Sequence, residues 1–378
     1  MRKEGIIKAG KIIIKLMIVL ISISAALMYT VISVEPHESQ RVRADEGSTR
    51  FYIRNINING TKISNYHLTD PFFLYQDSVY IPITVAVGNI CGFGYLCSED
   101  NEKLLLTAIE PEAKQLQELK IKRGDETIPV TIRHDLSVFV NDEPKRVESV
   151  TNGCIYNFDP AGAYEMDLEG LPVLQGDDDV FYLPLKAFST DPVFSWDIYH
   201  DLNYGICIST DEGLEAQSFW SEKESKYNQG LAAYIRSRNQ ELKETISQEY
   251  AFYFRNAAER YKVDVEWLMA ISQCESGYRP EVVSPSGAVG MMQIMPATGK
   301  AYGLSVADLK NPKKNIDFGA KYFGQLMSGY SGDRTRALSA YKMGIAAENA
   351  GGYETSYAET ITWAYNNLNA YLSSHGYQ

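Results

Sequence analysis

The chain has 378 residues, more than a single ordinary hydrophobic core uses, so we expect two or three domains. Apolar residues make up 45% of it, which is typical of globular rather than disordered proteins. With 48 acidic against 36 basic residues the formal net charge is −12, which argues against binding nucleic acid, or holding anionic lipid or wall polymers by charge. The five histidines are scattered without metal-ligand spacing, so no metal and no cofactor are predicted.

The N-terminal segment has the pattern of a membrane anchor. Basic residues occur up to Lys15, and residues 16–34 form a stretch of 19 without a charge. At about 1.5 Å per helical residue this approaches the thickness of a bilayer's hydrocarbon core. We predict a cytoplasmic N-terminus (1–10), an uncleaved single-pass signal-anchor (11–34), and the rest of the chain outside the cell. The alternative is a signal peptide that is cleaved and a secreted product, but no clear small-x-small cleavage site is present after the apolar run.

After a linker (35–50), residues 51–216 are predicted to form a β-rich (α+β) region. Short β-favouring runs are separated by Gly, Asp, Asn and Pro, and Asn59-Gly60 is a hairpin signal. An internal repeat is visible, because the pattern that begins at 79–83 and continues to 107 recurs about one hundred residues later, from 181 to 210.

These repeated units resemble the copper amine oxidase N-terminal-like domain, a stalk module of surface proteins in Gram-positive bacteria. The name implies no copper here, since no ligand set is present. The resemblance implies wall binding or spacing, and hence contact with a cell-wall polymer; a β-rich spacer without a ligand is the alternative. The acidic run 177–179 lacks the spacing of a calcium loop and is interpreted as a solvated turn.

Five cysteines outside the cytoplasm would leave at least one unpaired. Cys91 and Cys97 are close enough in sequence to form a disulfide around a Gly-rich turn, or they could be two buried thiols. Cys274 has no accompanying His motif that would suggest a nucleophile, so we interpret it as a buried structural thiol.

Residues 217–246 are rich in charged, helix-favouring residues and are predicted to be a helical linker. An all-α domain should come next, at 247–378. Within it, Asp264, Leu268, Ile271 and Glu275 share one helix face, and Gly277 marks the helix end, so Glu275 should lie in the last turn. Burial and the negative end of the helix dipole would both disfavour a charged carboxylate there, as a general acid requires. The other interpretation is a Glu that caps the polar rim of a buried helix.

Four further blocks come after Glu275: Ser284 with GAVGMMQIMPATG at 287–299, Asn311-Pro312, NIDFGAKYFGQLM at 315–327, and ALSAYKMG at 337–344. In this order they resemble the catalytic core of the Slt-type lytic transglycosylases, which have a goose-lysozyme-like α fold. The resemblance implies that Glu275 is the catalytic acid and base. It also implies that the substrate-binding residues are Ser284, Met292, Gln293 and Tyr341.

The side chains in these blocks also indicate roles by their own chemistry. The amide of Gln293 offers donors and an acceptor suited to an amino sugar. Met291 and Met292 could either fill core or line the cleft. The 315–327 stretch has an ordinary buried helical face, and we assign it no chemistry.

Two departures from the family pattern stand out. Where the family usually has A-Y-N-x-G, this chain has Lys342 in place of the Asn. An E-T-x-x-Y-V segment near the C-terminus is matched best by 359–364, with Trp363 at the Tyr position, while 354–357 is a rival registration that offers Tyr357.

The resulting expectation is an outward-facing enzyme whose partner is the glycan strand of peptidoglycan. It would cleave the β-1,4 bond between N-acetylmuramic acid (MurNAc) and N-acetylglucosamine (GlcNAc) and leave a 1,6-anhydro-MurNAc end. Only one carboxylate lies in the matched motifs, which favours a substrate-assisted reaction. The alternatives are a hydrolytic muramidase and a catalytically inactive wall-binding protein.

Overall fold

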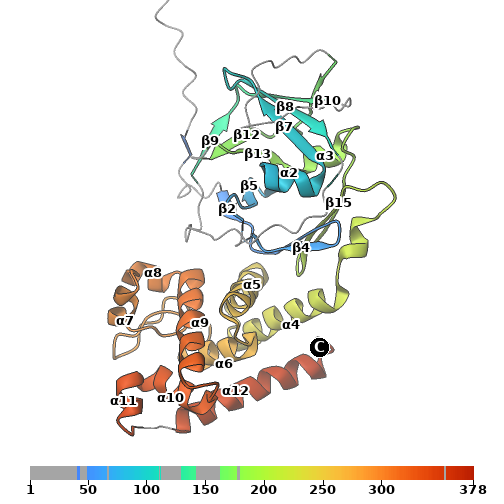
Figure 1. Ribbon diagram of the computed structural model, residues 1–378. Helices are drawn as coiled ribbons and strands as arrows, with labels where there is room; N and C mark the ends of the chain where they lie inside the picture. The colour runs from blue at the N-terminus through green and yellow to red at the C-terminus, as the bar shows by residue number, and fades with distance from the viewer. Residues whose placement is uncertain are drawn as a thin grey trace, which may run out of the picture.

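The computed structural model describes residues 41–42, 49–65, 68–109, 111, 129–141, 162–176, 179–352 and 355–378. In these ranges the strands all precede residue 210 and the long helices all follow residue 221, so a β-rich part is joined to a helical part (Figure 1). None of the helices described is both long and apolar enough to span a membrane. The predicted anchor at 11–34 lies outside the described residues.

In the described ranges the β-rich part contains three sheets. The largest has seven strands in the order β1 (Arg41–Val42), β9 (Val130–Arg133), β12 (Val173–Gly176), β13 (Phe181–Pro184), β6 (Ser78–Ile83), β5 (Phe73–Tyr75) and β2 (Thr49–Phe51). A second consists of β11 (Tyr164–Glu165), β10 (Ser137–Asn141), β8 (Lys103–Ala108) and β7 (Phe93–Cys97). The third consists of β14 (Asp197–Asp201), β15 (Gly205–Ser209), β3 (Asn55–Ile58) and β4 (Thr61–Ile63), and two short helices, α2 (Val85–Cys91) and α3 (Leu185–Thr190), complete this part.

The predicted repeat is present and is more extensive than its sequence match. Unit 1 runs from β2 to β8 and unit 2 from β9 to β15, each in the order strand, hairpin, hairpin, short helix, hairpin. The units meet where β6 pairs with β13, with Ile81 opposite Leu183. Each then gives a hairpin to the other: β3 of unit 1 pairs in parallel with β15, and β10 of unit 2 pairs in parallel with β8. The two units are therefore interlocked.

Local signals in the β-rich part behave as the residue types suggest. Asn59 and Gly60 connect β3 to β4 with φ angles of 50° and 79°, the left-handed pair that a tight hairpin turn needs. Cys91 and Cys97 are both buried thiols and are not joined in a disulfide, so of the two alternatives for this pair the structure has the buried thiols.

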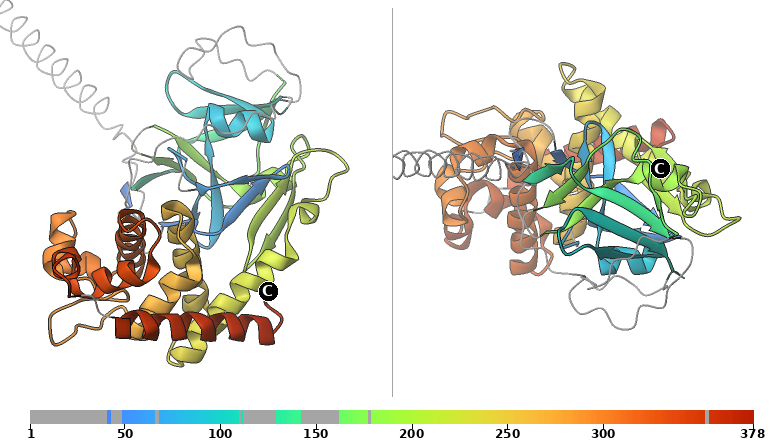
Figure 2. Two further views of the ribbon diagram at one scale, coloured as in Figure 1. Left: turned by 60° about the horizontal axis from the view of Figure 1, so that its bottom comes forward. Right: turned by 90° about the horizontal axis from the view of Figure 1, so that it is seen from above.

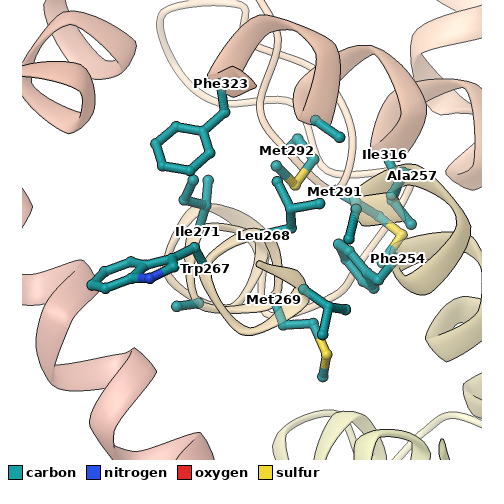
Figure 3. Close-up of a cluster of buried hydrophobic side chains, with 14 of the residues drawn as sticks. Phe254, Ala257, Trp267, Leu268, Met269, Ile271, Met291, Met292, Ile316 and Phe323 are labelled. Carbon is teal, nitrogen blue, oxygen red and sulfur yellow. The ribbon is translucent and has the colours of Figure 1, made fainter. Parts of the chain in front are cut away.

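Helices of the helical part surround α6 (Val265–Ser276), which packs against its neighbours α5, α9 and α12. Figure 3 shows Ile271 of α6 next to Phe323 and Leu268 next to Met292, in one buried cluster that also contains Met291. The other helices are α4 (Glu222–Arg238), α5 (Glu244–Tyr261), α7 (Pro296–Ala301), α8 (Val306–Lys310), α9 (Pro312–Gly329), α10 (Arg334–Met343), α11 (Ile345–Asn349) and α12 (Thr355–Ser374).

The segment predicted as a helical linker, 217–246, differs from that expectation. After a 3-10 turn at Ala216–Phe219, α4 packs against α5 and α12 and buries Leu231, Tyr234 and Ile235 in the helical core. Figure 2 shows α4 in yellow-green beside the red α12, with the C-terminus close to it. The helix is thus part of the domain core, because its apolar residues follow the helical period although six of its 17 residues are charged.

Glu224 on α4 connects the two parts of the molecule. Its Oε1 accepts hydrogen bonds from Lys62 Nζ (2.7 Å), Asn55 Nδ2 (3.1 Å) and Arg255 Nη2 (3.0 Å), that is, from β4, β3 and α5. A second contact runs from the Asn256 side chain to the backbone oxygen of Ile53, at 2.9 Å. The helical part is therefore held to the β-rich part by specific polar contacts.

We predict that Glu224→Gln weakens this junction and removes part of the pH dependence of stability. Burial alone would raise the pKa of Glu224, but the hydrogen bond and charge of Lys62, followed by Arg255, outweigh it and lower that pKa. The stabilisation is therefore present above about pH 4.3 and is lost as the pH falls through the lowered folded-state value. Urea unfolding should show a loss of about 1 kcal/mol at pH 7, shrinking in acid.

Glu222→Gln is the matched control, because Glu222 is exposed on the same helix and contacts only Lys226 among the charged side chains described. It should change stability little at either pH. An equal loss for Glu224→Gln at pH 7 and in acid would contradict the assignment.

Candidate active site

Glu275 lies in the last turn of α6, as predicted. The helix ends at Gly277, whose φ of 61° is a left-handed conformation that a glycine adopts without strain. The Glu275 side chain is 13% exposed. Its Oε1 accepts a hydrogen bond of 2.7 Å from the Tyr357 hydroxyl of α12, and Lys342 Nζ of α10 lies 4.0 Å away. Three helices therefore converge on this carboxyl group.

The carboxyl group opens into a cleft of about 470 Å³, a size that suits a small ligand or part of a longer one. The lining residues are Glu275, Ser284, Ser286, Ala288, Gln293, Ile294, Met295, Thr298, Tyr322, Tyr341, Lys342, Met343 and Gly344. Among the residues that the structure describes, Glu275 is the one acidic residue in this lining and Lys342 the one basic residue. The rest of the lining offers neutral hydroxyl, amide, aromatic and aliphatic groups, which suits an uncharged polar ligand such as a sugar.

One wall of the cleft is the loop after α6, which is attached to that helix by hydroxyl groups. Ser276 and Ser272 both donate to the backbone oxygen of Met291, at 2.8 and 3.1 Å. The Tyr341 hydroxyl donates to the backbone oxygen of Met292, at 2.9 Å. Ser276 adjoins Glu275 in the chain, so the loop and the acid are positioned together.

Asn315, in the first turn of α9, holds the same loop through hydrogen bonds of its side chain. Its amide nitrogen donates to the backbone oxygens of Val289 (3.0 Å) and Leu309 (2.8 Å), and its amide oxygen accepts from the Met292 N–H (2.6 Å). The side chain is fully buried. Gly290 has a φ of 83°, and a Cβ there would lie 2.1 Å from the Leu309 oxygen, so only glycine fits. The sequence pattern indicates no chemistry for the 315–327 segment, yet its first residue shapes the cleft wall.

Four of the predicted site residues, Glu275, Ser284, Gln293 and Tyr341, line this one cleft. The Gln293 amide nitrogen donates to the backbone oxygens of Val282 (3.1 Å) and Gly290 (2.9 Å), so its donors hold the loop. The Ser284 hydroxyl accepts from the Ala288 N–H at 3.0 Å. Both residues thus shape the wall as well as presenting atoms to the cleft.

Met292 is not where the resemblance had implied. Its side chain is fully buried, packs against Gly319, and is absent from the cleft lining. The reason lies in its backbone, which is held by Asn315 on one side and by Tyr341 on the other. Met291 is also fully buried. Both methionines therefore fill the hydrophobic core, which was one of the two alternatives, and neither lines the cleft.

Tyr357 was not among the predicted site residues. Only the rival registration of the C-terminal motif, 354–357, hinted at it, and the better-matching registration leads to Trp363, which is 61% exposed. Burial, and then the charge of Glu275, raises the pKa of both Tyr357 and Tyr341 well above that of a free tyrosine. Both hydroxyls therefore remain protonated donors at neutral pH.

Cys274 differs from its interpretation as a buried thiol, because it is exposed. Partial burial of the sulfur and then the charge of Glu275 raise its pKa to about 11. A thiol with that pKa stays protonated at neutral pH and is a poor nucleophile.

Comparison with known proteins agrees with the predicted nature of the helical part. The family described as "Transglycosylase SLT domain" matches residues 252–363. Membrane-bound lytic murein transglycosylase C of Edwardsiella ictaluri is 37% identical over 114 residues, which are 28% of this chain and 32% of the relative. Endo-type membrane-bound lytic murein transglycosylase A of Klebsiella pneumoniae is 37% identical over 106 residues, covering 25% of this chain and 52% of the relative.

The match is confined to one region of each protein. This chain spans about a third to a half of the length of these curated relatives. Among solved structures, the lytic transglycosylase Slt of Pseudomonas aeruginosa is 21% identical, with a TM-score of 0.29 over 43% of this chain and 32% of that one. The family match thus identifies residues 252–363 of the helical part as similar to a transglycosylase SLT domain, whereas the resemblance of the β-rich part to a copper amine oxidase-like stalk stays a prediction.

We predict that Asn315→Ala destabilises the fold by about 2–4 kcal/mol, because it removes three hydrogen bonds in a buried place. Of the three backbone groups that lose a bond, the Val289 oxygen keeps a second one, from the Ile294 N–H. Chemical denaturation measures the loss. Asn349→Ala is the matched control, since Asn349 is exposed and accepts only a 3.4 Å hydrogen bond from Tyr330; it should cost less than about 0.5 kcal/mol. Equal losses for the two variants would show that the Asn315 amide does not hold the loop.

Proposed function

We propose that the helical part cleaves the β-1,4 bond between MurNAc and GlcNAc in peptidoglycan and leaves a 1,6-anhydro-MurNAc end. The observation that carries this proposal is the largely buried carboxyl group of Glu275, the single one among the described residues of a cleft that is otherwise lined by neutral groups and Lys342. The matched SLT region supports it, as do the relatives, which are named lytic murein transglycosylases.

The chemistry rests on having one carboxyl group. Protonated Glu275 donates its proton to the glycosidic oxygen, and GlcNAc leaves as an alcohol. The acetamido oxygen of MurNAc attacks its own anomeric carbon, which supplies the nucleophile that a second carboxylate would otherwise be. Glu275, now a carboxylate, removes the proton of the MurNAc 6-hydroxyl. That oxygen attacks the anomeric carbon, the acetamido group is released, and the 1,6-anhydro ring closes with Glu275 protonated again.

The neighbouring residues have positioning and binding roles in this proposal. The Tyr357 hydroxyl orients the Glu275 carboxyl group through its 2.7 Å hydrogen bond. Ser284 and Gln293 present polar atoms to the sugar from the loop wall, and Tyr341 fixes the loop through Met292. Water attacking in place of the 6-hydroxyl would give hydrolysis instead.

We predict that Glu275→Gln lowers the release of muropeptides from purified sacculi by at least about 10²-fold, because the amide cannot donate a proton. Mass spectrometry of the products of the unmodified chain should show ends that are one water lighter than reducing ends. Circular dichroism of Glu275→Gln should show the same fold as that of the unmodified chain.

Glu281→Gln is the matched control, since this exposed glutamate pairs with Lys310 outside the cleft lining, and its activity should be unchanged. Near-normal release by Glu275→Gln would refute the role of this residue. Reducing ends in the products would instead assign the site to a hydrolytic muramidase.

Lys342 supports a second candidate, a wall-binding protein without activity. Its ammonium group lies 4.0 Å from Glu275 Oε1 and 5.2 Å from the centre of the Tyr357 ring, where the family pattern has a neutral amide. A cation at this position could hold the carboxyl group away from substrate.

Lys342→Asn separates the two candidates. If the chain is an enzyme, the unmodified protein releases muropeptides and the variant stays within about tenfold of it, because the proton donor is retained. If the chain is an inactive binder, the unmodified protein sediments with sacculi without releasing sugar, and the variant gains release. Muropeptide release is the measurement in both cases.

We also propose attachment to the cytoplasmic membrane through residues 11–34, with the C-terminus outside. The uncharged run in the sequence supports it, as do the relatives named membrane-bound. Cell fractionation tests it: an anchored chain stays with the membranes through a high-salt wash, whereas a cleaved one is recovered outside the cell in soluble form.

A further inference from the structure

A second cavity of about 480 Å³ lies in the β-rich part, and it belongs to no site described so far. It is formed where the unit 1 strands of the seven-stranded sheet face the β14–β15 hairpin and α3. Every residue that lines it precedes residue 210. Its apolar lining includes Leu74, Val79, Leu185, Ile198 and Ile206. The size and the apolar walls suit a small ligand with an apolar body.

Two polar side chains that line this cavity lack the partners they would be expected to have. The Tyr52 side chain is 1% exposed, and its hydroxyl has no hydrogen-bond partner among the described residues. Burying a hydroxyl group without a partner is unfavourable. Arg54 donates from Nε to the Leu202 backbone oxygen at 2.9 Å and lies over the Phe252 ring, but no carboxylate in the described part of the chain pairs with it.

The other charged residues of the cavity are compensated. Arg50 pairs with Asp77 at 3.0 Å, and Lys186 pairs with Glu169 at 2.8 Å. Partial burial and then the charge of Arg54 lower the pKa of His200, so His200 is neutral at pH 7. Among the residues described, the guanidinium of Arg54 is therefore the uncompensated positive charge of this cavity.

In unit 2, the position that corresponds to Arg54 carries a carboxylate of the protein itself. Strand pairing relates the units: Phe51 pairs with Phe73, which pairs with Tyr80, just as Ile132 pairs with Leu174, which pairs with Tyr182. Phe51 thus corresponds to Ile132.

By the same register Tyr52 corresponds to Arg133, and Arg54 to Asp135. In unit 2 these two residues form an ion pair with each other: Arg133 Nε lies 2.8 Å from Asp135 Oδ1, and the arginine is 9% exposed. Unit 1 has a cation and a buried hydroxyl at the corresponding places and no carboxylate.

We propose that this cavity binds a carboxylate carried on a small apolar body, such as the C-terminal residue of a short peptide. The carboxylate oxygens accept hydrogen bonds from the Arg54 guanidinium and, after a local rearrangement that uncovers it, from the buried Tyr52 hydroxyl. The apolar body lies on Leu74, Val79 and Ile206. The site is separate from Glu275 and does not depend on the proposed glycan cleavage.

The test measures binding of N-acetyl-alanyl-alanine and of its C-terminal amide to the full-length chain by calorimetry. The acid should bind, and the amide should bind at least about tenfold more weakly, because it lacks the charge that Arg54 recognises. Arg54→Gln should weaken binding of the acid by a similar factor. Glu275→Gln should leave binding unchanged, so that failure of the glycan-cleavage proposal and failure of this one can be told apart.

Tyr52→Phe is the sharpest variant. Without a ligand it should keep or raise the melting temperature, since it removes a buried hydroxyl that has no partner, yet it should weaken binding of the acid. Tyr80→Phe is its control: the Tyr80 hydroxyl donates to the Pro172 oxygen at 3.0 Å, outside the cavity lining, so this change should lower the melting temperature and leave binding intact. Equal binding of acid and amide, no effect of Arg54→Gln, or no binding of either probe would each overturn the proposal.

Discussion

The cleft depends above all on one buried amide. Asn315 links three backbone groups of the loop wall and the turn before α9, and it has no access to water that could replace these bonds. Met291 and Met292, on the same loop, carry the carbonyl oxygens to which Ser276 and Tyr341 donate. The wall and the helix end that carries Glu275 are therefore one hydrogen-bonded assembly, which is how a short irregular loop can present polar atoms at fixed positions.

The sequence predicted those parts of the site that depend on local pattern. Helical periodicity and Gly277 placed Glu275 in the last turn of its helix, and the motif order brought Ser284, Gln293 and Tyr341 to one cleft. What it could not predict depends on tertiary contacts. Tyr357 reaches Glu275 from a helix 82 residues further along the chain, and Met292 turns inward because two distant side chains hold its backbone. The core role of α4 was hidden by its charged composition.

The β-rich part illustrates the same distinction at the scale of a domain. The repeat was visible in sequence from β6 to β8 and from β13 to β15, and at its start both units contribute a Tyr-x-Pro run to the centre of the sheet. The exchanged hairpins have no comparable sequence signal, because their partners lie in the other unit. The units have also diverged at corresponding places, with Arg133 and Asp135 in one and Tyr52 and Arg54 in the other, and pairing register rather than residue identity shows that these positions correspond.

The interlocking of the two units has a consequence for how the protein is made. Strand β3, near residue 55, obtains its parallel neighbour only when β15 has emerged about 150 residues later. Pairings at such separation close late and slowly, since a long loop must be ordered before they contribute. During synthesis the β3–β4 hairpin of unit 1 therefore has an unpaired edge until unit 2 is complete. A unit produced without the other would expose such an edge permanently.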